Sequence, residues 1–74
     1  MFKRDVEISS MEWQTYYLGF RANSIKVSAE LDIEMDILNS PRRVRQFEQD
    51  DISVEIIKLR CVNRVPVTVS IEAR

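Results

Sequence analysis

The fold of this chain is decided by residues 25–37, which read IKVSAELDIEMDI. Every odd-numbered position in this stretch is apolar and every even-numbered one is polar, the period of a strand with one buried face. A straight strand of this length would extend about 43 Å, whereas a compact chain of this size has a radius of gyration of about 11 Å. We therefore predict a hairpin, and the shared odd parity of its arms places a three-residue turn at Glu30-Leu31-Asp32.

A helix is predicted upstream of this hairpin. Ser9 and Glu12 have the spacing of a capping box, and Ile8 and Trp13 occupy the flanking positions of a hydrophobic staple. These paired signals mark the start of a helix, so we expect one over residues 10–18.

The apolar side chains of the predicted helix form a single stripe, and Gly19 supplies a C-terminal stop. We expect the stripe to dock the helix on the sheet, with Trp13 buried. Stacking of its aromatic rings on nucleic-acid bases is the alternative. A short alternating strand over residues 5–8 precedes the helix. The stripe consists of Trp13, Tyr16, Tyr17 and Phe20.

The segment after the predicted hairpin carries helix-start residues. Ser40 can cap a helix and Pro41 is favoured at a first helical position, so we predict a turn or 3₁₀ segment through Phe47. Further along, the apolar positions switch from even to odd numbers near Ile56, which predicts a β-bulge there.

The C-terminal residues alternate over 65–71 and predict a last strand. Residues 62–64 fit the turn of a closing hairpin. Because Pro66 cannot donate a ladder hydrogen bond, we expect this strand to start at a sheet edge. The predicted hairpin pairs Leu59 with Val67 and Ile57 with Val69.

These elements together predict one α+β domain over residues 1–74. Its sheet is mainly antiparallel, or a small open barrel, of roughly five strands with one N-terminal helix, in the order β-α-β-β-β-β. A chain of 74 residues has room for one core only.

Two short motifs carry a family resemblance. Residues 16–19 read Tyr-Tyr-Leu-Gly, and Arg45 and Phe47 match two positions of a Leu-Arg-Pro-Phe type segment. With these motifs the chain resembles the small bacterial domain-of-unknown-function family 2835 over nearly its whole length. It departs from that family in having no glycine in either predicted hairpin turn and none beside Ile52. The resemblance implies the order of elements and brings no known activity.

The composition argues against an enzyme. The chain has no histidine, so histidine-activated nucleophiles and imidazole metal ligands are unavailable. The carboxylates at positions 30, 32, 34 and 36 lack the spacing of a cation-binding loop and read as a solvated strand face. We expect no catalysis, metal or cofactor.

The single cysteine points to a reducing compartment. Cys61 lies in an apolar run and cannot close an intrachain disulfide, so we expect a buried thiol and a cytoplasmic protein. No apolar run approaches the ~20 residues that span a bilayer, and we expect no membrane partner.

Arginines at 42, 43 and 45 form the only dense basic cluster. At the start of a helical turn they would oppose the helix dipole, an arrangement that can mark a phosphate- or partner-binding site. The alternative is a short solvated turn in which Arg45 pairs with Glu48 and the arginines cross to the acidic strand face of Glu34 and Asp36.

Two functions follow from these observations. The leading hypothesis is a non-enzymatic binding or regulatory module that acts through protein contact, with a homodimer as one form of that contact. The alternative is nucleic-acid or nucleotide binding through the Arg42, Arg43 and Arg45 cluster, although a net charge of −1 disfavours nonspecific coating of nucleic acid. Lys26, Lys58 and Arg60 are further candidate cations for the alternative.

Overall fold

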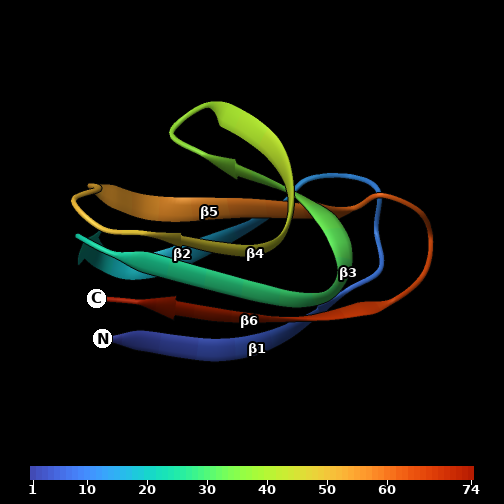
Figure 1. Cartoon of the computed structure of the whole chain (residues 1–74), viewed down its shortest axis with the longest axis horizontal. Helices are drawn as coiled ribbons and strands as arrows, with labels where there is room; N and C mark the ends of the chain where they lie inside the picture. Colours follow the sequence, from blue (N-terminus) through green and yellow to red (C-terminus); the bar gives the residue numbers. More distant parts are fainter.

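The computed structural model describes all 74 residues, and its regular structure consists of six antiparallel β-strands (Figure 1). The α+β prediction is therefore wrong, and the domain is all-β. No helix is present that could span a membrane. The strands are β1 (Phe2–Ile8), β2 (Gln14–Ala22), β3 (Ile25–Ile37), β4 (Ser40–Gln49), β5 (Val54–Cys61) and β6 (Val67–Ala73).

Strand β3 is the centre of the fold, and it is one bent strand where a hairpin was predicted (Figure 1). Residues 25–29 pair with β6, and residues 33–36 pair with β5. The predicted turn residues lie between these two ladders, at the bend. The exclusion of a straight strand was correct. The strand fits within the domain because it bends, without reversing the chain, and the bend keeps the odd-numbered side chains on the inner face.

The bend in β3 divides the strands into two layers. One layer contains β1, β6 and the first half of β3, and the other contains β2, β5 and its second half. Strand β4 pairs with both halves of β3, so the β3–β4 hairpin passes from one layer to the other. Strands β1 and β2 end the sheet path, and the result is a nearly closed barrel.

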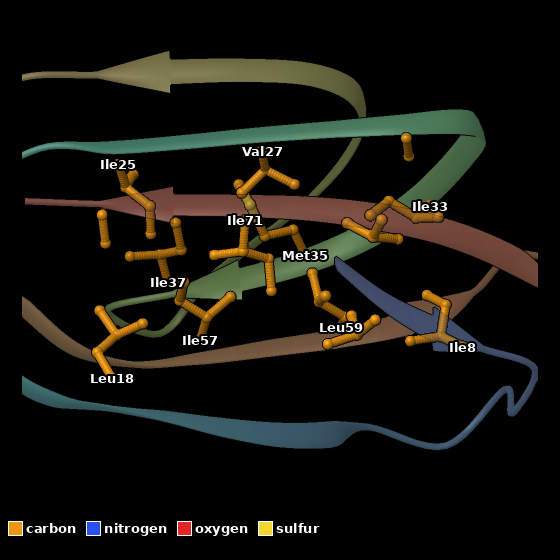
Figure 2. Close-up of a cluster of buried hydrophobic side chains, with 14 of the residues drawn as sticks. Ile8, Leu18, Ile25, Val27, Ile33, Met35, Ile37, Ile57, Leu59 and Ile71 are labelled. Carbon is orange, nitrogen blue, oxygen red and sulfur yellow. The ribbon is translucent and has the colours of Figure 1, made fainter. Parts of the chain in front are cut away.

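One core of 18 buried apolar side chains fills the space between the layers, and Figure 2 shows part of it. Both layers contribute to it, and in β3 every odd position is buried except Leu31, which is 43% exposed at the bend. The core residues are Val6, Ile8, Leu18, Ala22, Ile25, Val27, Ala29, Ile33, Met35, Ile37, Val54, Ile57, Leu59, Cys61, Val67, Val69, Ile71 and Ala73.

The turn that joins β3 to β4 explains why residues 40–47 are not helical. Leu38 and Asn39 have φ angles of 55° and 59°, and the flanking residues Ile37 and Ser40 pair. Two central residues with positive φ define a type I′ turn, whose twist suits a β-hairpin. Ser40 and Pro41, which were predicted to cap and begin a helical turn, are the first two residues of β4.

The predicted helix over residues 10–18 is also wrong. The Ser10 hydroxyl accepts a hydrogen bond from the Glu12 N–H at 3.0 Å, which closes a local turn without a helix following it. Strand β2 then begins at Gln14, because Tyr, Thr and Phe favour the pleated surface of a sheet. Its inward-facing positions are 16, 18, 20 and 22, so side chains alternate with a period of two. This period separates residues that a helix would place on one stripe.

The side chains of that stripe therefore do not form a docking face. Tyr17 is 71% exposed on the outer face of β2, while Tyr16 and Phe20 are half-buried against the core. The prediction of a buried Trp13 is wrong as well, since it is only half-buried, outside the core.

The closing hairpin is a further correction. Strands β5 and β6 lie in different layers and do not pair with one another. Strand β6 is flanked by β1 and β3, so it is internal, and Pro66 stands just before it where no ladder bond is required. The irregularity predicted near Ile56 is confirmed in position, but the additional residues belong to the opposite strand, between Tyr17 and Ala22.

Candidate binding surfaces

The three candidate arginines lie on β4 but do not form one cluster. Arg42 is opposite the core residue Met35, and its guanidinium lies 5.1 Å from the ring centroid of Phe47. Arg43 is opposite Glu34 and faces outward. Arg45 lies at the bend. Their closeness in sequence suggested that the three side chains lie together. In a strand, however, successive side chains point to opposite faces, so the three are separated.

Arg45 is held by an ion pair across the bend. Its Nε lies 3.1 Å from Asp32 Oδ1, and both side chains are more than half exposed. Such an exposed pair contributes little to stability. It nevertheless ties β4 to the unpaired corner residues of β3, so Arg45 is already partnered.

Arg43 belongs to a row of side chains across the outer face of the second layer. Arg60 Nε lies 3.0 Å from Glu34 Oε1, and the Arg60 guanidinium stacks 4.2 Å from the ring centroid of Trp13. Glu34 thus lies between Arg43 on one side and Arg60 on the other, because cross-strand partners share a face. Sequence analysis identified Arg60 as a candidate cation but missed its contact with Trp13, which only the strand register of β2 reveals.

An exposed apolar patch lies beside this row. We use the name apolar patch for the exposed Tyr17, Leu38 and Ile56 and for the half-buried Phe20 at their border, which line two neighbouring clefts. Tyr17 and Ile56 are cross-strand partners on β2 and β5, and Leu38 is in the β3–β4 turn. Tyr17, Leu38 and Ile56 are 71%, 62% and 40% exposed. Sequence reasoning missed the patch because it assigned Tyr17 and Phe20 to a buried helical stripe.

Charged groups border the apolar patch. A cleft of about 300 Å³ between Leu38 and Ile56 is lined by Arg21, Asp36 and Lys58 among others. Oxygen Oδ1 of Asp36 is buried and has no hydrogen-bond partner in the chain. Buried acceptors are nearly always satisfied, so this oxygen is an unusual unpaired group beneath the cleft.

Two groups have perturbed acidities. Burial raises the pKa of the Cys61 thiol. Burial also raises the pKa of the Tyr16 phenol, and the positive charge of Arg4 lowers it by a smaller amount. Neither side chain lies in the clefts beside the apolar patch, so these shifts bear on stability.

Two of the acidic side chains of β3 are already paired with arginines. Asp32 pairs with Arg45 and Glu34 pairs with Arg60. No group of three or more histidine, cysteine, aspartate or glutamate residues is placed to hold a metal ion.

Comparison with known proteins identifies the fold. The chain is similar to a de novo designed double-stranded β-helix solved by solution NMR, with a TM-score of 0.71 at 13% identity over 100% of both chains. At this identity the likeness concerns the fold alone. No protein-family model and no curated protein matches the chain. Membership of family 2835 therefore remains a proposal that rests on the short motifs.

Proposed function

We propose that this domain is a non-enzymatic binding module that acts through protein contact, and that the apolar patch is its contact surface. The observation that carries the proposal is the exposure of Tyr17, Leu38 and Ile56 side by side at one end of the outer face. Contiguous apolar side chains of this kind are costly to leave in water and commonly mark interaction surfaces.

The composition of the patch and its border supports a protein ligand. Aromatic residues are enriched at the centres of protein interfaces, and polar groups surround them. Tyr17 supplies the aromatic centre, while the exposed Arg21–Glu55 ion pair, 3.6 Å apart, and Lys58 supply the polar border.

The proposed location is the cytoplasm. Cys61 is buried in the core at 2% exposure and is the only cysteine of the chain. A domain of this size without a disulfide is typical of a reducing compartment, whereas small secreted domains are typically disulfide-rich.

Capture experiments with matched variants test the proposal. The immobilised domain is compared with Tyr17→Asp, which places a charge in the apolar patch, and with Thr68→Asp, an exposed position on β6 in the other layer. We expect the unmodified domain and Thr68→Asp to retain the same partners in similar amounts. Tyr17→Asp should retain about tenfold less of each partner, or lower still. Equal retention by all three proteins would contradict the proposal, provided that circular dichroism shows each to be folded.

A second candidate function uses the neighbouring row of charged residues. Arg43, Lys58 and Arg60 lie on one outer face with Trp13, which gives nucleotide phosphates and bases suitable contacts. In this version of the nucleic-acid alternative, Arg43 belongs to the binding surface, whereas Arg42 and Arg45 do not. Binding of a single-stranded oligonucleotide that weakens steeply with salt, and further with Lys58→Ala, would favour it over protein contact.

A further inference from the structure

We propose that two copies of this chain associate by antiparallel pairing of their β4 strands about a two-fold axis, with Arg43 of each copy opposite Glu48 of the other. The inference concerns the edge of the sheet and is independent of the apolar patch. It is carried by three features of β4, namely a free edge, a local irregularity and a reversal of charge along the strand.

The first feature is the free edge. Strand β4 has ten residues and pairs only with β3, so its other edge has no partner. Residues that flank a two-residue turn bond to each other, so Ser40 directs its backbone groups toward β3. Alternation then directs Pro41 and Arg43 toward the free edge. Pro41, which lacks an N–H, thus stands where the chain itself loses no bond.

The second feature is the irregularity near Arg45. Val44 is opposite the core residue Ile33, and Phe47 is opposite the core residue Val27, so both face inward. In a regular strand, residues 44 and 47 would face opposite sides. Because of the irregularity, inward and outward side chains follow in the same order from the middle of β4 toward either end.

This order selects one register for two-fold pairing. With Arg45 opposite Gln46 of the second copy, Val44 meets Phe47 on the inner face, and Arg43 meets Glu48 on the outer face. A slip by one residue would set inward side chains against outward ones. In the matched register the half-buried Val44 and Phe47 of each copy would gain apolar cover from the other copy.

The third feature is the charge along β4. The strand is basic at 42, 43 and 45 and acidic at 48, and the acidic residues 50 and 51 follow it. Charges and proline on an edge strand ordinarily discourage pairing with other chains. Antiparallel pairing of two identical copies is the arrangement that brings the basic half of one edge to the acidic half of the other.

Charge reversal and rescue test this interface. Sedimentation equilibrium at high micromolar concentration should show a reversible dimer of the unmodified chain. Arg43→Glu should weaken the dimer by about tenfold, because it opposes like charges at two symmetric positions. The double variant Arg43→Glu with Glu48→Arg should restore most of the affinity. Lys3→Glu, on the free edge of β1, is the control and should leave the dimer unchanged.

A strictly monomeric chain would overturn the inference, and would mean that the charges of β4 guard the edge. A dimer that the double variant fails to restore, or that Lys3→Glu weakens equally, would overturn it too. Tyr17→Asp should leave the dimer intact, so failure of this interface and failure of the apolar patch are separate results.

Discussion

Cys61 is the most enclosed reactive side chain of the domain. Its Sγ lies 3.3 Å from the carbonyl oxygen of Ile8 and 3.5 Å from that of Val65, so the protonated thiol can act as a weak donor to either. Its backbone N–H also donates to the Ser10 carbonyl oxygen at 2.8 Å. The thiol therefore lies where the end of β1, the following loop and the end of β5 meet.

The acidity of this thiol predicts how stability depends on pH. Burial raises the pKa of Cys61 in the folded state, so the folded protein keeps a proton that the unfolded chain loses above about pH 8.5. The stabilisation is complete below that pH and is lost as the pH rises through the folded pKa. Urea unfolding of the unmodified chain should thus weaken from about pH 8.5 to 10, and less so for Cys61→Val.

Tyr16 supplies the comparison for this measurement. Its raised pKa adds a loss of stability that begins near pH ~10 and persists in Cys61→Val. If the free energy of unfolding fell equally with pH for the unmodified chain and Cys61→Val between about pH 8.5 and 10, folding would not raise the pKa of the thiol.

Individual elements differ in how far the sequence specified them. The alternation of residues 25–37 correctly predicted strand structure and its buried face, and the burial of Cys61 followed from the same logic. The helix prediction failed because Ser9 and Glu12 satisfied a local motif, whereas the period of two at positions 16, 18, 20 and 22 reflects tertiary burial. Local capping signals contribute little compared with a shared core.

The β3–β4 turn was missed because one of its residues is unsuited to its conformation. Asn39 tolerates positive φ, but Leu38 at φ 55° is unusual, and neither residue is glycine. Missing this turn displaced the predicted hairpin to residues 30–32, and it hid β4. The candidate arginines were consequently assigned to a helical turn and to one cluster.

The same residue gives a prediction for stability. Leu38→Asn should stabilise the domain by about 0.5–1 kcal/mol, because asparagine occupies the left-handed region more readily than leucine. Leu31→Asn is the matched control, since Leu31 is also an exposed leucine but its φ is not positive. If thermal melts showed the same increase in stability for both substitutions, the increase would come from removing an exposed apolar side chain and not from the backbone conformation.

At the scale of the whole molecule, pairing between distant strands defeated prediction. The sequence suggested a hairpin of β5 with β6 because they are neighbours, but β6 pairs with β1 from Phe2 opposite Ala73 to Ile8 opposite Val67. Alternation shows that a strand has a buried face and leaves the identity of its partner open. The two layers and the outer-face row followed from pairing and were therefore beyond sequence reasoning.

Pairing of the terminal strands predicts that the chain tolerates circular permutation. Joining Met1 to Arg74 by a short Gly-Ser linker and opening the chain between Asn63 and Arg64 should give a folded protein, because that loop is exposed. The permutant should refold faster, since the β1–β6 ladder becomes a local hairpin. Stopped-flow refolding measures the rate.

A second permutant, opened between Leu38 and Asn39, serves as the comparison. It interrupts the tight β3–β4 hairpin and should be clearly less stable than the first. If the first permutant failed to fold, the β1–β6 ladder would depend on the original order of the strands along the chain.

The β1–β6 ladder also decides how the domain would respond to tension. Both chain ends lie at the same end of this ladder, where Phe2 meets Ala73 (Figure 1). A pull on the two ends would load its hydrogen bonds one after another, as in a zipper, instead of shearing all of them at once. Anchored by its termini, this domain would therefore be a mechanically soft link that yields by peeling β1 away from the layer.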